Sequence, residues 1–231
     1  MITSTVFYKH MKNWLSKETS KFTGYIYFNK EKAYATDTHA MVIVKKWPAA
    51  EEHFEDAKGA LVKPEKGPLP LEKVLLRKEE IVWNYEKTIA PGLAKSFFEP
   101  RKNAMDFIKK LTKNRKYSPV FLECKNGKLS ACAVGDSVKA RVILLEDPAL
   151  NTNHWEGVYN SKYLGNAFAF LLETEPINLT MKVAFRQEHP VLEMETEDLI
   201  FCMTCINKNA EELYDLMAFA HYSDDDSSYL E

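Results

Sequence analysis

Hydrophobic residues along this chain follow two periods, one typical of helices and one typical of strands. Near the N-terminus, apolar residues at helical spacing predict an amphipathic helix from Ser4 to about Ser16: Val6, Phe7, Met11, Trp14 and Leu15. Three predicted strands follow, joined by an Asn-Lys-Glu turn and a polar corner, Thr36-Asp37-Thr38-His39: Thr23–Phe28, Lys32–Asp37 and Ala40–Trp47. The first 47 residues therefore predict one helix followed by a β-meander.

The same order of elements returns twice. A helix from about Arg101 to Lys113 precedes three predicted strands: Tyr117–Cys124, Lys128–Val134 and Val138–Glu146. A short strand, Trp155–Tyr159, and a helix, Ser161–Glu173, precede three more: Ile177–Ala184, Val191–Glu195 and Leu199–Ile206. Such repeats bury their helices on a shared sheet, so we predict an α+β fold with helices packed on antiparallel sheets and internal helix–three-strand repeats.

The gap between residues 47 and 101 has room for one further unit but shows no amphipathic helix. It holds a Pro/Gly-rich, charged loop, Ala49–Pro70, and a strand-like segment, Ile81–Ile89. We therefore expect a first domain at 1–95 whose second half is eroded to a loop at 48–79. A second domain is expected at 96–207, followed by an acidic extension at 208–231.

Composition narrows the class of protein. The 231 residues are 45% hydrophobic and 28% charged, as in ordinary soluble domains. No apolar run approaches the length of a membrane span, and the N-terminus lacks the apolar core of a signal peptide, so we expect a cytoplasmic protein. Four cysteines in a chain of this length are expected to be reduced thiols.

The charge is distributed unevenly along the chain. Residues 1–170 carry 28 Lys/Arg against 19 Asp/Glu, whereas residues 171–231 carry 3 against 14. A basic first part with an acidic last part is compatible with a nucleic-acid face and a solvated tail, and equally with an arbitrary distribution of surface charge.

Candidate catalytic and metal-binding motifs are weak. Cys202 and Cys205 form a CxxC, but positions three apart on a strand face opposite sides, so buried strand cysteines are the preferred interpretation over a zinc or redox pair. Asp37 and His39 lack a third group in a recognisable arrangement, and no phosphate-binding GxxxxGK[ST] occurs. We therefore expect no enzyme activity, no catalytic residues, no metal and no cofactor.

Three segments resemble one family in its own order. KAYATDTHAMVIV at Lys32–Val44 is similar to a strand–ATDGHRLA–strand segment, and EIVWNYEKTIAP at Glu80–Pro91 is similar to a connector, GxFP(D/N)YxxVIP. VYNSKYLGNAFAFL and LIFCMTCI, within Val158–Ile206, are similar to FNxxYLxxAL and a terminal YVxMPM. Together the chain resembles the bacterial sliding clamp, the β subunit of DNA polymerase III, as a truncated and divergent member.

The departures from that family are clear. The chain begins where the second of three clamp domains would begin, and Thr38 and Ala40 replace the Gly and Arg of the corner. Trp83 and Thr204 replace prolines of the connector and the terminal strand. These substitutions lie at the peptide groove of the family. They put in question the shape and the peptide specificity of that groove in this chain.

The resemblance implies contact with DNA phosphates, without reading of sequence, through helices that line a central hole. Lysines on helices make such contacts; the alternative is a solvated helix face. The candidate DNA-contact residues are Lys9, Lys12, Lys17, Arg101, Lys102, Lys109, Lys110 and Lys113.

The resemblance also implies an apolar groove for short linear peptides of replication and repair proteins. The residues that match the groove, some of which could equally be core residues, are Thr36, Thr38, His39, Ala40, Met41, Trp83, Lys87, Thr88, Phe201, Cys202, Met203, Thr204 and Cys205. Met, Trp and Phe suit apolar anchors.

The expected function is that of a processivity or scaffold factor that binds double-stranded DNA and partner peptides. The alternative is a monomeric peptide-binding module, or decoy, with no DNA function. Six clamp domains in a ring would require three two-domain chains, so a homotrimer is the ring-forming expectation, with a monomer or open dimer otherwise. The segment Glu211–Phe219 predicts an amphipathic helix that either packs on the sheet edge or occupies a groove.

Overall fold

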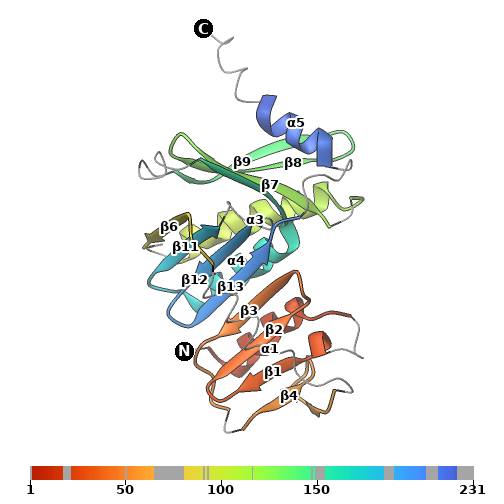
Figure 1. The fold of residues 1–231 in the computed structure, drawn as a ribbon, viewed down its shortest axis with the longest axis vertical. Coiled ribbons are helices and arrows are strands. Elements are labelled where there is room, and N and C mark those ends of the chain that lie inside the picture. Colours follow the sequence, from red (N-terminus) through yellow and green to blue (C-terminus); the bar gives the residue numbers. More distant parts are fainter. Residues whose placement is uncertain are drawn as a thin grey trace.

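The computed structural model describes residues 2–17, 22–49, 51–64, 81–90, 92, 94–115, 117–146, 148, 154–184, 190–206 and 213–222. In these residues a layer of helices covers one side of the strands, and a smaller sheet lies above the helices in the view of Figure 1. This arrangement confirms the predicted α+β class with helices packed on antiparallel sheets.

The first predicted unit is present, with shorter elements. Its members are α1 Ser4–Met11 with a 3₁₀ turn at Lys12–Trp14, β1 Ile26–Asn29, β2 Lys32–Thr36 and β3 Ala40–Val44. The Thr3 side chain accepts a hydrogen bond from the amide of Val6 and so begins α1. Phe7, Met11 and Trp14 are completely buried, as their helical spacing predicts.

The loop predicted at Ala49–Pro70 was wrong in its first part, which forms a hairpin of β4 His53–Glu55 and β5 Leu61–Val62. The Asp56 carboxylate accepts hydrogen bonds from the amides of Lys58 and Ala60, and Gly59 takes φ +84°. This turn chemistry closes the hairpin. Residues 65–80, the rest of the segment predicted to be eroded, lie outside the described residues.

The other two units follow the predicted order. The elements are β6 Tyr85–Ile89, α3 Ala94–Leu111, β7 Pro119–Lys125, β8 Lys128–Val134, β9 Lys139–Glu146, β10 Trp155–Asn160, α4 Ser161–Thr174, β11 Leu179–Ala184, β12 Val191–Glu195, β13 Leu199–Thr204 and α5 Tyr214–Tyr222. Helix α3 begins seven residues before its predicted start and contains Pro100. Asn160 caps α4 by accepting from the amide of Lys162, and Glu175 ends it in a left-handed conformation.

The strands form two sheets, ordered β5-β4-β1-β2-β3-β13-β12-β11-β6 and β10-β7-β8-β9. The larger sheet is continuous because β3 of the first unit pairs antiparallel with β13 of the third unit. In all three units the second and third strands are joined by the same backbone hydrogen bond, from the amide of Asp37, Gly135 or Thr196 to the carbonyl three residues on. This shared geometry supports the interpretation as an internal repeat.

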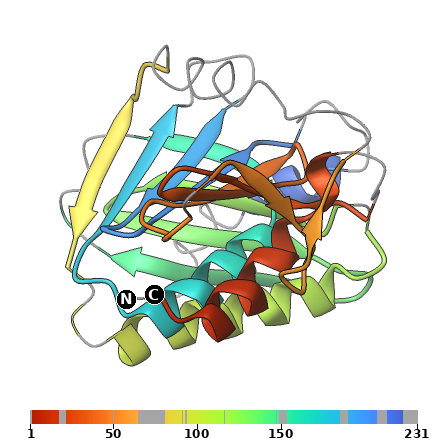
Figure 2. The same cartoon turned by 90° about the horizontal axis from the view of Figure 1, so that it is seen from below.

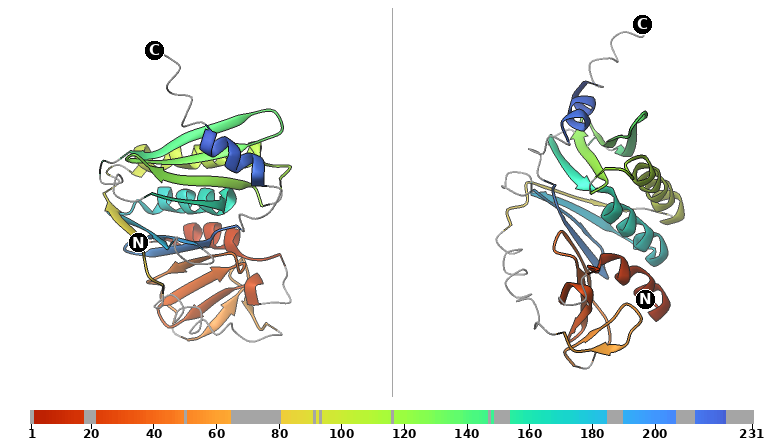
Figure 3. Two further views of the ribbon diagram at one scale, coloured as in Figure 1. Left: turned by 45° about the horizontal axis from the view of Figure 1, so that its top comes forward. Right: turned by 90° about the vertical axis from the view of Figure 1, so that its right-hand side faces the viewer.

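Helices α1, α4 and α3 lie side by side along one face of the molecule, with α4 in the middle (Figure 2). Seen from the side, these helices stand to the right of the larger sheet, and α5 lies apart from them against the smaller sheet (Figure 3). Residues of the larger sheet that face the helices, such as Val42 and Phe201, belong to the main core. Their neighbours Met41 and Ile43 belong to a separate apolar cluster on the opposite face.

None of the helices in the described residues is long and apolar enough to cross a membrane.

Candidate functional site

The polar corner between β2 and β3 is fixed by side-chain hydrogen bonds. One oxygen of the Asp37 carboxylate accepts from the amides of His39 (3.1 Å) and Ala40 (3.2 Å), and the other accepts from the Tyr163 hydroxyl of α4. Burial and the bond to Asp37 raise the pKa of the Tyr163 hydroxyl, which therefore stays a donor. The carbonyl of His39 accepts from both the amide and the hydroxyl of Thr204, each at 3.0 Å. The corner is thus tied to the helix layer and to β13.

Thr38, at the tip of this corner, has φ +82°, which is a strained conformation for a β-branched residue. The resembled family has glycine at this position, and glycine adopts a positive φ without a steric cost. The corner therefore keeps the shape that glycine would allow, at the expense of backbone strain.

Replacing Thr38 by glycine is expected to raise the free energy of unfolding by about 0.5–1 kcal/mol, because relief of the strain exceeds the added entropy of the unfolded chain. Urea unfolding of wild type and variant measures the difference. The Thr38→Ala control keeps a Cβ and should change little. A Thr38→Gly variant less stable than Thr38→Ala would contradict this account.

A hollow of about 380 Å³ opens beside the corner. Its lining combines the chain between α1 and β1, the corner and the first turn of α4: Leu15, Ser16, Lys17, Thr23, Asp37, Thr38, His39 and Lys162. The ring of Tyr117, nearly half exposed, lies 6.4 Å from that of His39. The hollow is mainly polar, whereas the groove implied by the family resemblance is apolar.

The residues predicted to form the peptide groove do not all face one surface. Ala40, Phe201 and Met203 point into the helix-covered core and are at most 4% exposed. Thr36 and Met41 lie with Cys202 on the other side of the sheet, in register across β2, β3 and β13. Thr38, His39 and Thr204 are exposed at the end of these strands, beside Cys205. These last residues are the predicted ones that border the open corner.

The connector residues lie at the far edge of the larger sheet. Lys87 and Thr88 are on β6, which β11 and β12 separate from β13. Three interstrand spacings amount to about 14 Å. Trp83 precedes β6, and its ring lies 5.9 Å from the ammonium of Lys182. The structure therefore does not bring Trp83, Lys87 and Thr88 together with the corner.

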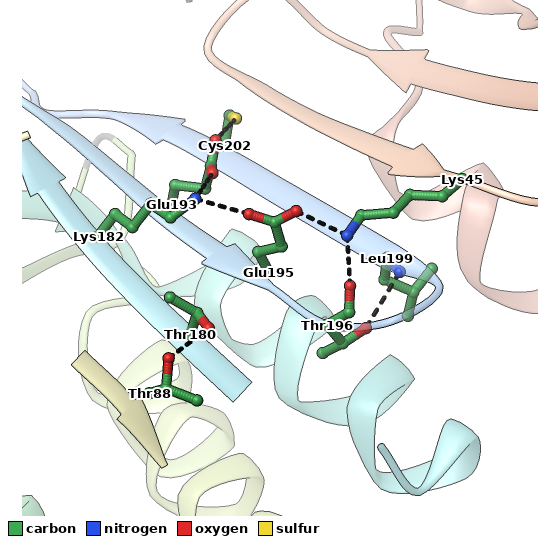
Figure 4. Close-up of polar contacts among 9 residues, drawn as sticks. All are labelled: Lys45, Thr88, Thr180, Lys182, Glu193, Glu195, Thr196, Leu199 and Cys202. Atoms are coloured by element: carbon green, nitrogen blue, oxygen red, sulfur yellow. Dashed lines mark hydrogen bonds and ion pairs between the residues drawn. The ribbon is translucent and has the colours of Figure 1, made fainter. Parts of the chain in front are cut away.

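A network of charged residues crosses the junction between β3 and β13 on the face away from the helices (Figure 4). Glu195 pairs with Lys45 at 2.6 Å and with Lys182 at 2.7 Å, and Lys45 also donates to the carbonyl of Thr196. Lys182 reaches the buried Glu193, which accepts from the Cys202 thiol. Partial burial raises the pKa of Glu195, but the two lysines outweigh it and lower that pKa to about 2.

A carboxyl with a depressed pKa in the folded state adds stability that is present above its unfolded pKa and is lost at lower pH. For Glu195 this window runs from about pH 4.5 down to about pH 2. We expect Glu195→Gln to be less stable at neutral pH by about 1 kcal/mol, after allowance for solvent screening, and to converge with wild type in acid. Unfolding midpoints across this pH range measure the effect, with the exposed Glu146→Gln as control. Parallel curves for Glu195→Gln and wild type would contradict it.

The lysines predicted to contact DNA lie on α1 and α3 and in the segments that follow these two helices. Lys12, Lys17, Lys109, Lys110 and Lys113 are exposed. Lys9 pairs with Glu173, and Lys102 pairs with Asp106 at 2.8 Å. Arg101 is different, because its guanidinium stacks 3.6 Å above the Phe97 ring and donates to the Phe97 carbonyl. These contacts of Arg101 are therefore internal to α3.

Sequence reasoning missed Lys95. It is exposed in the first turn of α3. The seven-residue spacing of Lys95, Lys102 and Lys109 places them on one stripe of the helix, and Lys113 follows in the turn after its last residue. The prediction began the helix after Pro100, because an interior proline normally ends a helix. The same reasoning missed Lys162 and Tyr163, which approach the corner only through the packing of α4.

The candidate metal and redox groups are separated. The Cys202 thiol donates to the buried Glu193, whereas the Cys205 sulfur accepts from the amide of Val158 on β10. Among the described residues, Glu123, His154 and Glu156 lie close enough to share an ion. However, the guanidinium of Arg141 lies 3.5 Å from Glu123 and supplies positive charge there.

Helix α5 packs on the outer face of the smaller sheet. Both predicted positions of this helix, on a sheet edge or in a groove, were therefore wrong. Leu213, Leu216 and Ala220 form a cluster with Phe121, Cys132, Val134 and Val158. Arg115 holds the first turn of α5 by a bidentate pair with Asp215, and Arg141 donates to the carbonyl of Ala220. Residues 223–231 lie outside the described residues.

No protein-family model and no curated protein matches the sequence. Solved structures do match. The β chain of DNA polymerase III from Streptococcus pneumoniae is 14% identical, with a TM-score of 0.61 over 90% of this chain and 64% of that one. The β subunit from Pseudomonas aeruginosa is 13% identical, with a TM-score of 0.62 over 88% and 64%. The Helicobacter pylori β clamp bound to a DNA ligase peptide is 10% identical, with a TM-score of 0.60 over 87% and 62%.

The chain spans less than two thirds of the length of these clamps. The match nevertheless covers 87–90% of this chain, at identities of 10–14%. The resemblance inferred from the three sequence segments is confirmed at the level of the fold: this chain has the fold of the bacterial DNA polymerase III β sliding clamps.

Proposed function

We propose that this protein is a non-catalytic, clamp-like scaffold that contacts duplex DNA through its helix layer and binds linear peptides at the polar corner. The observation that carries this proposal is the row formed by α1, α4 and α3 (Figure 2), since exposed lysines lie along α3 and at the end of α1, the two outer helices. Lysines on such a surface neutralise phosphates without reading sequence, which suits a protein that moves along DNA.

The peptide part of the proposal has separate support. The clamp of H. pylori, which shares the fold, is bound to a DNA ligase peptide. In this chain the corner is open and borders β13, where the first and third units meet. The proposed organisation remains a clamp-like domain at 1–95 and another at 96–207, with a homotrimer as the ring-forming assembly and a monomer or open dimer as the alternative.

Three measurements test the proposal. Sedimentation gives the mass, with about three times the 26.6 kDa chain expected for a ring. Retention of duplex DNA should be present at low salt and fall steeply as salt rises. A labelled form of the H. pylori ligase peptide should bind, as measured by fluorescence anisotropy. DNA that is not retained even at low salt rejects the DNA function and leaves the peptide-binding module; absence of peptide binding rejects the peptide function.

A further inference from the structure

The hollow beside the corner is positively charged. Its lining includes Lys17 from the chain after α1, Lys162 from the first turn of α4, and His39 from the corner. The carboxylate of Asp37 also lines the hollow, but it already accepts three hydrogen bonds from groups that fix the corner. Two ammonium groups therefore face a single carboxylate that is engaged in holding the backbone.

The first turn of α4 adds to this charge. Lys162 is the second residue of the 14-residue helix, and the N-terminal end of a helix carries a partial positive charge. The second lysine, Lys17, comes from the chain beyond α1. Lys17 and Lys162 are 145 positions apart in sequence, so the hollow exists only because α4 packs beside α1.

Beside His39, the edge of the hollow carries the Tyr117 ring and strained backbone. Tyr117 and Ser118, on the side of the His39 ring, both have positive φ, as does Thr38. Strained non-glycine residues gather at binding sites more often than elsewhere. Leu15, inside the hollow, and the ring of Tyr117 offer surface that an inorganic anion would leave uncovered.

We infer that this hollow binds an acidic side chain of an extended peptide, whose neighbouring apolar or aromatic side chain packs on the rim of His39 and Tyr117. This inference rests on the proposed peptide function and specifies its partner class. Charge-assisted hydrogen bonds from Lys17 and Lys162 would select a carboxylate over an amide of the same shape. The groove residues Ala40, Phe201 and Met203 cannot make this selection, because they are buried.

The test uses the full chain and two labelled nonapeptides. One has the sequence SDDDSSYLE, which also occurs at residues 223–231, and the other replaces its Asp and Glu by Asn and Gln. To remove competition from residues 223–231, the titrations are repeated on a full chain with Asp224→Asn, Asp225→Asn, Asp226→Asn and Glu231→Gln. We expect the acidic peptide to bind at least about tenfold more tightly than the neutral one.

That preference should disappear in Lys17→Gln/Lys162→Gln and persist in Lys46→Gln, which neutralises an exposed lysine at the opposite end of β3. Equal affinity for the two peptides would overturn the inference while leaving peptide binding intact. The inference would also be overturned if the H. pylori ligase peptide bound and neither nonapeptide did. If none of the three peptides bound, the proposed peptide function itself would be rejected. Inorganic phosphate is also added as a competitor. If it lowered the affinity of the acidic and the neutral peptide equally, the lysines would be assigned to a phosphate ligand instead.

Discussion

Replacing Phe201 by alanine is expected to lower the free energy of unfolding by about 3–5 kcal/mol. The Phe201 side chain is completely buried and packs against Trp14 of the first unit and Phe170 of α4, with ring centroids 5.4 and 6.0 Å away. Removal of the ring leaves a cavity where the first unit, the helix layer and β13 meet, and the walls of such a cavity collapse only in part. Chemical denaturation measures the loss.

The matched control is Thr204→Ala on the same strand. Thr204 is exposed and gives one side-chain hydrogen bond to the corner, so its loss should cost less than about 1 kcal/mol. The two variants separate a core residue from a residue at the corner. If Phe201→Ala kept its stability but lost affinity for the H. pylori ligase peptide, Phe201 would be a wall of the groove, and the core assignment would be wrong.

The repeating units were predictable because their side chains alternate on strands and recur at helical spacing on helices. The prediction located β8 and β12 with their observed bounds, since turn residues border each of them. The pairing of β3 with β13 could not be predicted from local pattern. Those strands are more than 150 residues apart, and each reads as a buried strand whatever its neighbour.

The candidate groove was less predictable than the fold. The resemblance selected consecutive residues, Phe201 to Cys205, although a strand turns alternate side chains to opposite faces. Phe201 and Met203 consequently belong to the core, and Cys202 belongs to the charged network. Lys162 lines the hollow only because α4 packs beside α1. That packing joins distant parts of the chain, so the local sequence pattern does not predict it.

Helix α5 illustrates the same limit. Its apolar residues predicted an amphipathic helix, but its position depends on two arginines from other units. Arg115 follows α3, Arg141 lies on β9, and each meets a different end of α5. An acidic residue in the first turn, Asp215, and a carbonyl near the last turn are the groups that such cations favour.

Removing three lysines from α3 and the turn that follows it is expected to weaken duplex DNA binding by roughly two to three orders of magnitude at 0.1 M salt. The variant is Lys95→Ala/Lys109→Ala/Lys113→Ala, which changes exposed positions and should fold as wild type does. Each lost phosphate contact removes about 0.9 from the slope of log affinity against log salt concentration, so three contacts should reduce that slope by roughly 2.7. Anisotropy titrations over a series of salt concentrations measure both quantities.

The control removes the same charge from the strands and their turns, where the fold places no helix surface: Lys32→Ala/Lys46→Ala/Lys128→Ala, also at exposed positions. It distinguishes contact with DNA from a general change of charge, because both variants lower the net charge by three. An equal loss in both variants would mean that DNA responds to overall charge, and the helix layer would not be the contact surface. A loss confined to the α3 variant, with the reduced slope, requires that phosphates meet α3 itself, since only counterions released at a contact change the salt dependence.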